Sequence, residues 1–407
     1  MDPKPRPIIL LFTTFPKTSE TFLQRDVAAL QAQGLNLRLY SLWGGGGVFR
    51  GLPVRSFNKW KLVSLFLFII PWQCVYRPRL IRDLFEGVLT RRAPSWLNFW
   101  ENMLGAGFAG CFYHELKKEP PALIHGAWAG APATAGWVLW RMFGWPYSTG
   151  AHAYDIYEHG GDWWLREKLR HARFIHTSTE VAKRELVDRG VNPAQIRVIR
   201  RGLDTFPPFK PLRAQRQPLR LIAIARLVPK KGLDYQLAIY AALKEAGLDF
   251  EARIVGDGPL QAALEAQAAH LGIAAQVKFL GKLPQAGVWE QLAWADVLLH
   301  TGIVAPSGDR DGLPNVIPEA MAAGVLVVTS PVSATTEAVQ QSRTGVVADV
   351  DLPLAWVVAL RQLGEDNKLA ESLRAAARRW VEENYDAHRN TARLTACFEE
   401  AMKTPEI

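Results

Sequence analysis

The chain has 407 residues, of which 49% are hydrophobic and 21% charged, which is the composition of a folded protein and excludes general disorder. This length exceeds what one hydrophobic core usually covers, so we expect two domains. The formal net charge of +9 fits an anionic small ligand, an anionic membrane or nucleic acid, and charge alone does not choose among them. Three widely spaced cysteines, Cys74, Cys111 and Cys397, indicate neither a zinc knuckle nor a disulfide framework and fit a cytoplasmic location.

The first elements in the chain form a strand, a helix and a second strand. Residues 8–15 are a compact apolar run, residues 21–34 carry apolar side chains at helical spacing, and residues 35–43 alternate like a strand. No small-residue cleavage site follows the first run, so we interpret it as a strand and not as a signal peptide. This order predicts the start of an α/β domain.

A basic and aromatic segment, residues 59–100, comes next. Its most apolar part, residues 62–76, has 15 residues and is interrupted by Pro71, whereas a helix needs roughly 20 apolar residues to span a bilayer. Flanking arginines, lysines and tryptophans are typical of a segment that lies at the headgroup level of an anionic membrane. A buried helix with a solvated basic rim is supported equally well. Because no zinc-finger spacing or RNP-like motif is present, we expect no nucleic-acid partner.

Three later strand candidates, residues 122–128, 146–153 and 172–178, end in loops that carry His, Ser or Thr. In parallel α/β sheets such loops lie at the carboxyl ends of the strands, where ligands bind. A proline-rich, basic linker at 204–218 then separates this half from a second series of strands and helices. We therefore predict two doubly wound, Rossmann-like α/β domains, residues 1–208 and 209–380, with a C-terminal helix at 381–407 that crosses back to the first.

In the second half, the segment DGLPNVIPE places Asp311 and Glu319 around a helix start. Pro314 suits the first turn of a helix and Gly324 its end. The backbone N–H groups that such a start leaves free for phosphate or sugar oxygens are those of Gly312, Leu313 and Asn315. Since carboxylates accept hydrogen bonds from both hydroxyls of a diol, the segment predicts a nucleotide-sugar site. A capped helix with a solvated Glu319 is the alternative.

A second segment, ARLVPKKG (225–232), favours the nucleotide-sugar interpretation. Arg226 and Lys231 flank a turn between a buried strand and a helix, where cations stabilise a departing diphosphate. The alternative is a pair of solvated cations at a helix start. With this charge already supplied, we interpret Asp309-x-Asp311 as unrelated to a metal site and expect no metal and no cofactor.

Four motifs in order, ARLVPKKG, IVGDGP (254–259), VKFLG (277–281) and DGLPNVIPEAMAAG (311–324), resemble the C-terminal domain of retaining glycosyltransferases of the GT-B fold. This is the large family 4, which includes sucrose and trehalose-phosphate synthases. FPKTSETF (15–22) and GAHAYDIY (150–157) are similar to the subgroup that builds bacterial exopolysaccharides and lipid-linked oligosaccharides. The resemblance covers the whole chain, but its motifs are specific mainly in the C-terminal half.

The resemblance implies a role for each matching residue. Arg226 and Lys231 would hold the donor diphosphate, and Glu319 the ribose. His152 would contact the donor hexose near the reaction centre. Asp311 would hold the donor sugar. The other donor-binding positions that it implies are Gly256, Gly312, Leu313 and Asn315.

The sequence departs from the family pattern at two places. Ser19 and Glu20 stand where many members have Gly-Gly, and residues 201–204 read Arg-Gly-Leu-Asp in place of Asn-Gly-Val-Asp. We assign Ser19, Glu20 and His125 to the acceptor side as second-tier residues, although a lone histidine at a strand end is more often a structural hydrogen bonder.

The resemblance implies transfer of a hexose, with retention of configuration, from a nucleotide diphosphate sugar to a hydroxyl group. We expect UDP rather than GDP in the donor, and a glycan, glycolipid or lipid-linked acceptor. The expected place is the cytoplasm, with peripheral contact to the inner face of the membrane. Two alternatives remain: a sugar-nucleotide epimerase of the same architecture, and a non-catalytic module that binds nucleotide or membrane.

Overall fold

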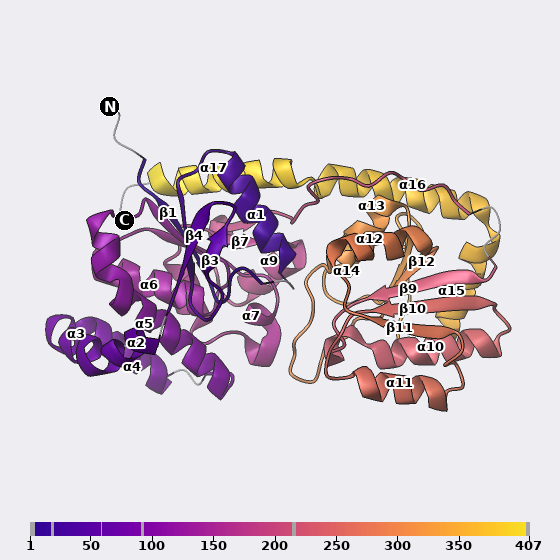
Figure 1. The fold of residues 1–407 in the computed structure, drawn as a ribbon, viewed down its shortest axis with the longest axis horizontal. Helices are drawn as coiled ribbons and strands as arrows, with labels where there is room; N and C mark the ends of the chain where they lie inside the picture. The colour runs from indigo at the N-terminus through magenta and orange to yellow at the C-terminus, as the bar shows by residue number, and fades with distance from the viewer. Residues whose placement is uncertain (1–4, 18–19, 58, 91–92, 214–216, 404–407) are drawn as a thin grey trace. The chain divides into compact units, whose positions relative to one another are not determined.

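The computed structural model describes residues 5–17, 20–57, 59–90, 93–213 and 217–403, which fold into two compact units (Figure 1). The first unit contains the chain up to Gly202 and again from Ala387 onward. The second unit contains Leu203 to Asp386. The sequence predicted domain boundaries at 208/209 and 380/381. In the structure the first boundary lies slightly earlier, at 202/203, and the second slightly later, at 386/387.

The first unit is built on one sheet, which in the described residues has the strand order β3-β4-β2-β1-β5-β6-β7-β8. Every neighbouring pair is parallel except β3 and β4. The strands are β1 Ile8–Phe12, β2 Leu37–Ser41, β3 Gly47–Phe49, β4 Leu52–Ser56, β5 Leu123–Gly126, β6 Tyr147–Gly150, β7 Ile175–Thr177 and β8 Ile196–Val198. Its helices are α1 Thr21–Ala32, α2 Lys59–Ser64, α3 Ile70–Tyr76, α4 Pro78–Thr90, α5 Trp96–Lys118, α6 Ala131–Phe143, α7 Tyr154–Tyr157, α8 Leu165–Arg170, α9 Glu180–Asp188 and α17 Ala387–Lys403.

The second unit holds a parallel sheet whose order, in the described residues, is β11-β10-β9-β12-β13-β14. Its strands are β9 Leu219–Ile224, β10 Phe250–Val255, β11 Val277–Gly281, β12 Val297–His300, β13 Leu326–Thr329 and β14 Val346–Val347. Its helices are α10 Leu233–Glu245, α11 Gln261–His270, α12 Gln285–Trp294, α13 Val316–Ala323, α14 Thr335–Ala338, α15 Pro353–Glu365 and α16 Asn367–Asn384. Two parallel-sheet α/β domains confirm the predicted fold class.

The central strands are short apolar runs because helices cover both faces of each sheet. All five residues of β1 and all four of β12 are buried, and parallel strands of this kind read as continuous apolar sequence rather than alternating sequence. The C-terminal helix α17 belongs to the first unit, where buried Leu394 and Phe398 join the core beside β1 and α1.

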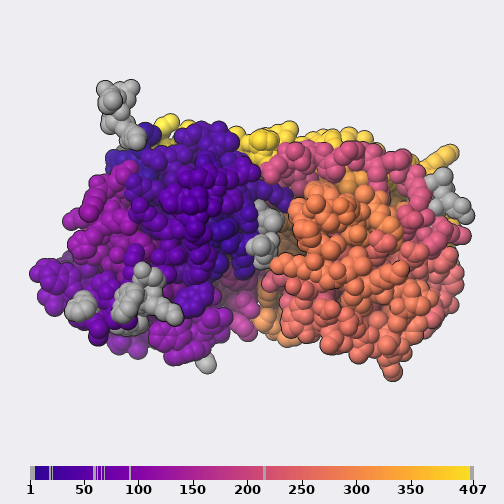
Figure 2. Space-filling model, in the orientation of Figure 1, coloured from indigo at the N-terminus to yellow at the C-terminus, as the bar shows by residue number. Residues whose placement is uncertain are grey.

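The basic, aromatic segment is helical and leaves many apolar side chains in solvent. A π-helical turn, Leu65–Ile69, joins α2 to α3, and Pro71 lies in the first turn of α3, where its missing N–H is tolerated. Trp72, Val75 and Leu89 are 52%, 74% and 70% exposed. These helices lie at one edge of the first unit (Figure 1) and contribute to the face in Figure 2. Within the described part of the chain, no helix has the length and apolarity to cross a membrane.

Candidate functional site

In the second unit, three adjacent strands end in loops that carry the predicted donor-side residues. Arg226 and Lys231 lie between β9 and α10, Gly256 follows β10, and Asp311 lies between β12 and α13. Because β10, β9 and β12 are neighbours in the sheet, their carboxyl ends meet at one edge. The structure thus brings together segments that are far apart in the sequence.

Two lysine–carboxylate pairs join these loops. Lys231 forms an ion pair with Asp311 through Nζ and Oδ2, and the neighbouring Lys230 contacts Asp309 Oδ2 at 2.9 Å. Lys230 Nζ also lies 3.5 Å from Asp311 Oδ1. The four side chains are 8% to 19% exposed, so each charge is partly desolvated, and removal of one partner would leave the other charge buried and unpaired.

The cations around Asp311 keep its carboxylate ionised. Burial alone would raise its pKa, but Lys231, then a contact from His300, then Lys230 lower it, and the net pKa lies well below the ordinary value. His300 is the last residue of β12, with Nε2 3.9 Å from Asp311 Oδ2 and Nδ1 3.2 Å from Thr329 Oγ1. Burial lowers the pKa of His300, so a neutral imidazole faces the carboxylate.

The start of α13 presents unused polar groups. Among the residues that the structure describes, the backbone N–H groups of Gly312, Leu313 and Asn315 donate no hydrogen bond. Asn315 is the N-cap residue, and its buried Oδ1 has no partner in the described structure. A helix N-terminus with free donors is a favourable place for an anion or for sugar oxygens.

Glu319 lies inside α13 and is only 6% exposed, so it is not the solvated helix residue of the alternative interpretation. Its Oε1 accepts a hydrogen bond of 3.3 Å from Gln285 Nε2 at the start of α12. Pro318 is tolerated because it falls in the first turn of α13, which begins at Val316 and not at Pro314.

Arg226 differs from the lysines because its side chain is exposed and, among the residues described, forms no hydrogen bond or ion pair. Its loop is packed against the loop after β10 at Gly256, whose φ is +141°. A Cβ atom there would lie 1.8 Å from the carbonyl oxygen of Ala225. Only glycine therefore allows this close approach, which fixes the loop that carries Arg226.

In the first unit, a row of buried histidines occupies the carboxyl ends of β5, β6 and β7. The rings of His152 and His176 are 4.9 Å apart, and Trp128 packs edge-on against His152 at 5.4 Å. His152 Nδ1 is buried with no partner in the described structure. Burial is the main cause that lowers the pKa of each ring: to about 4 for His176, to about 3 for His125, and well below the ordinary value for His152.

Asp155 holds the backbone around His152. Its Oδ1 accepts from the N–H groups of His152 and Ala153 at 3.0 and 2.9 Å, and its Oδ2 accepts from Ala129 at 3.0 Å. The fully buried carboxyl group thereby ties the loop after β6 to the loop after β5. Burial raises the pKa of Asp155, and the three backbone donors oppose that rise.

The second-tier acceptor residues have separate places in the first unit. Ser19 lies outside the described residues. Glu20 is the N-cap residue of α1 and forms an ion pair with Lys17 at 2.9 Å. His125 Nδ1 lies 2.9 Å from Ser148 Oγ, and its ring packs on Phe398 of α17.

Sequence reasoning missed four polar residues that shape these two groups: Lys230, His300, Gln285 and Asp155. Three of them had usable signals. Lys230 precedes Lys231 directly, and Asp155 lies in the same motif as His152. His300 ends an apolar run, which is the position that identified His125. For Gln285 the sequence carries no such signal, since only packing brings α12 beside α13.

The Asp309-x-Asp311 pattern has no further metal ligands beside it among the described residues. Asp309 and Asp311 are both engaged by lysines, and among the described residues no group of three His, Cys, Asp or Glu side chains could hold a metal ion.

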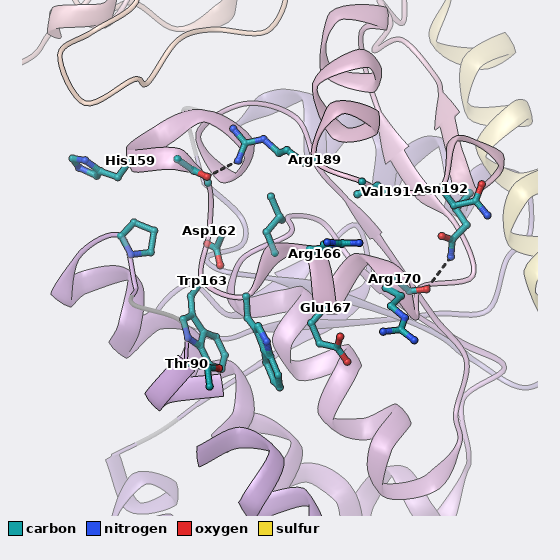
Figure 3. A pocket seen from close by; sticks show the side chains of 17 residues that line it. Thr90, His159, Asp162, Trp163, Arg166, Glu167, Arg170, Arg189, Val191 and Asn192 are labelled. Atoms are coloured by element: carbon teal, nitrogen blue, oxygen red, sulfur yellow. Dashed lines mark hydrogen bonds between the residues drawn. The ribbon is translucent and has the colours of Figure 1, made fainter. Parts of the chain in front are cut away.

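The first unit also has a pocket of about 1040 Å³, and none of the predicted site residues lines it. It lies among the loop that holds His159, helix α8 and the turn after α9, and Figure 3 shows Trp163, Arg166, Arg170 and Arg189 around it. Its size alone gives no reason to place the chemistry there.

Known families cover nearly the whole chain. The family described as "Glycosyl transferases group 1" matches residues 208–380, and the family described as "Glycosyltransferase Family 4" matches residues 20–205. The amylovoran biosynthesis glycosyltransferase AmsK of Erwinia amylovora is 32% identical over 390 residues, which cover 92% of this chain and 94% of AmsK.

Solved structures are similar over the same length. HepE of Anabaena, crystallised in complex with UDP, has a TM-score of 0.71 at 18% identity and covers 97% of this chain and 100% of its own. Sucrose-phosphate synthase of Thermosynechococcus elongatus has a TM-score of 0.71 at 15% identity and covers 97% of this chain and 99% of its own. At these identities the likeness concerns the fold.

Proposed function

Because the chain belongs to glycosyltransferase family 4, with the GT-B fold of its exopolysaccharide-type members, we propose that it transfers a hexose from a nucleotide diphosphate sugar with retention of configuration. The donor nucleotide is UDP in preference to GDP. The acceptor is a hydroxyl group of a glycan, a glycolipid or a lipid-linked sugar, and no metal ion takes part.

The observation that carries this proposal is the meeting of Arg226, Lys231 and Asp311 at one edge of the second sheet, beside the free N–H groups of α13. Exposed Arg226 is available to a diphosphate because no described residue neutralises it. Buried Glu319 is a suitable acceptor for the ribose hydroxyls. The UDP complex of HepE supports UDP as the nucleotide.

Donor binding would rearrange the lysine–carboxylate pairs. The diphosphate competes with Asp311 for Lys231, and the sugar hydroxyls compete with Lys231 for Asp311. Lys230, 3.5 Å from Asp311, keeps a positive charge beside the carboxylate after Lys231 has turned away. Exchange of one partner for another avoids leaving either charge buried and unpaired.

Catalysis then depends on stabilising the leaving group. The bond between the sugar and the diphosphate breaks as the acceptor hydroxyl attacks on the same face, negative charge grows on the departing phosphate oxygen, and that oxygen takes up the proton of the acceptor hydroxyl. Arg226 and Lys231 oppose that charge, an effect that is large in a preorganised site. His152 is uncharged at neutral pH, since its pKa lies well below the ordinary value. His152 therefore contributes a hydrogen bond that orients the hexose. It does not act as a cation that neutralises the leaving group.

The exposed apolar and basic helices α2 to α4 support a membrane-associated acceptor. Trp72, Val75 and Leu89 are more than half exposed. Arg79 and Arg82 of α4 are exposed as well, and Arg82 pairs with Asp83 at 3.5 Å. An apolar surface with basic neighbours fits the headgroup region of an anionic bilayer.

The test of the donor assignment is a thermal-shift titration with UDP, GDP and their sugar conjugates. A ligand at a hundred times its Kd should stabilise the native state by about 2.7 kcal/mol. We expect stabilisation by UDP-sugars, a weaker effect of GDP-sugars, and loss of the UDP effect in Arg226→Ala. The matched control is Arg379→Ala, which removes an exposed arginine of α16 in the same unit. If no nucleotide sugar stabilises the chain, the proposed function is wrong.

A further inference from the structure

His300 ends β12 with its imidazole ring beside the donor-side loops of the second unit. The ring is 5% exposed, and its Nε2 atom is buried without a hydrogen-bond partner among the described residues. Buried polar atoms of folded proteins are almost always paired, and an unpaired one costs stability. Transfer as proposed employs Lys231 and Asp311 and leaves this buried nitrogen without a use.

The place of the ring is set by the backbone around it. A Cβ atom at Gly302 would lie 2.5 Å from His300 Cε1, so glycine leaves the room that the ring occupies. One residue further, the N–H of Ile303 donates to the carbonyl oxygen of Lys230 at 3.0 Å. The loop that follows the ring is therefore tied to the turn that carries Lys231, and the ring stands at a fixed place beside that turn.

The surroundings of the ring favour one of its two neutral tautomers. If Nδ1 carried the proton, the lone pair of Nε2 would face Asp311, whose pKa lies well below the ordinary value and which is therefore ionised. If Nε2 carries the proton, its N–H faces the carboxylate, and the Thr329 hydroxyl donates to Nδ1 across 3.2 Å. That hydroxyl suits either tautomer, because the carbonyl oxygen of Ser330 is another acceptor at 3.2 Å. The carboxylate therefore decides, and it favours the proton on Nε2.

We propose that His300 is a positioning residue for Asp311: its Nε2–H takes over Asp311 Oδ2 when Lys231 turns to the donor diphosphate. In the structure Lys231 holds this oxygen, and Nε2 lies 3.9 Å away, beyond hydrogen-bond distance. The inference rests on the proposed function and deepens it, because it says what keeps the sugar-binding carboxylate in place once the lysine has left.

Asp311 needs such a partner because its side chain is only 15% exposed. Lys230 contacts the other carboxylate oxygen, Oδ1, at 3.5 Å, so departure of Lys231 would leave Oδ2 poorly solvated and unpaired. A carboxylate has about four lone-pair sites, so Oδ2 can accept from His300 and still accept from a sugar hydroxyl. A neutral imidazole also differs from a lysine in that the diphosphate does not attract it away.

His300 acts through Asp311 and not on the sugar. Its Nε2 is shielded from solvent by the surrounding protein, whereas Asp311 lies in the loop before α13, beside the free N–H groups of that helix. Loss of the ring should therefore weaken contacts to the sugar more than contacts to the nucleotide.

The test compares His300→Gln with His300→Asn by calorimetry. The amide nitrogen of glutamine can take the place of Nε2, and that of asparagine the place of Nδ1, which keeps only the contact to Thr329. The probe is whichever of UDP-glucose, UDP-galactose and UDP-N-acetylglucosamine binds the native chain most tightly, with UDP alone as the reference ligand. His270→Asn, which changes an exposed histidine of α11 in the same unit, is the matched control.

His300→Asn should weaken binding of the UDP-sugar about tenfold, the scale of one hydrogen bond to a charged group, and leave binding of UDP unchanged. His300→Gln should restore most of that affinity, and His270→Asn should bind as the native chain does. Equal losses in His300→Gln and His300→Asn would mean that the ring only fills space. No loss in either variant, or an equal loss for UDP and UDP-sugar, would also overturn the positioning role.

A second measurement needs no substrate. In the ¹⁵N spectrum of the chain labelled at histidine, the ring signals that disappear in His300→Gln should show the proton on Nε2, and a proton on Nδ1 would overturn the inference. If UDP-sugar binds the native chain and the His300 variants alike, the positioning role is wrong and the glycosyl transfer stands. If no nucleotide sugar binds the native chain, the proposed function fails and the positioning role fails with it.

Discussion

Mild acid should destabilise the first unit, because its site is built on neutral histidines. The pKa is lowered to about 4 in His176 and to about 3 in His125. In the unfolded chain both residues have a pKa of about 6.5. Between these values the unfolded state binds protons that the native state does not bind, so stability falls as the pH falls from about 6.5 toward 4.

The size of the effect follows from these pKa values. At pH 5 the unfolded form of each histidine gains about 2 kcal/mol relative to neutral pH, so His125 and His176 together remove about 4 kcal/mol. His152 acts in the same direction, because its pKa is also lowered. A loss of this size is a large part of the stability of an ordinary domain, which is about 5–15 kcal/mol.

Urea unfolding at pH 7.5 and pH 5.0, followed by tryptophan fluorescence, measures this loss. Of the 15 tryptophans, all but Trp289, Trp294, Trp356 and Trp380 precede residue 203, so the signal reports mainly on the first unit. The perturbation is His176→Gln, whose amide group replaces the hydrogen bond of 2.9 Å to the carbonyl oxygen of Ile199.

The variant should lose about 2 kcal/mol less than the native chain between the two pH values, because one protonation site has been removed. This comparison does not depend on how much the substitution destabilises the protein at neutral pH. An unchanged pH dependence in His176→Gln, or a native chain equally stable at both pH values, would refute the reasoning.

Four further predictions concern activity and binding. Glu319→Gln should weaken UDP affinity in calorimetry through the lost ribose contact, and an unchanged Kd would remove that assignment. Lys231→Ala should lower turnover by roughly two to three orders of magnitude, while the native enzyme keeps its activity in a chelator; a strict need for added magnesium or manganese would point back to Asp309 and Asp311 as metal ligands. His152→Ala should lower kcat and kcat/KM together with little change in UDP affinity, and near-normal kcat in a folded variant would contradict its role. The chain should sediment with anionic vesicles at low salt and less at high salt, and absence from the pellet at both salt concentrations would favour a soluble acceptor.

Local features of the chain were predictable because neighbouring residues determine them. Apolar residues 8–15 predicted a strand, and the structure has β1 at Ile8–Phe12 with every residue buried. Around Pro314 and Gly324, the sequence predicted a helix with a polar start and a glycine stop. The structure has α13 from Val316 to Ala323, and Gly324 has a φ of +75° in the left-handed region that favours glycine.

The pattern of residues 59–100 was predictable only in part. Mixed apolar and basic residues indicate helices with an apolar face, and the structure has α2 to α4 and the start of α5 there. Which apolar side chains are covered depends on what the rest of the chain packs against them. The sequence therefore left burial and membrane contact as equal alternatives, whereas the structure leaves Leu89 and Trp96 70% and 73% exposed.

The contacts between distant loops were decided by the order of strands in each sheet. Lys231 and Asp311 are 80 residues apart and meet because β9 and β12 are neighbours. His152 and His176 approach each other because β6 and β7 are neighbours. Hydrophobic periodicity specifies that a segment is a strand, but many strand orders bury the same side chains equally well. The sequence by itself determined which residues stand at strand ends and helix starts, and the tertiary structure alone decided which of those ends share an edge and so which charges meet.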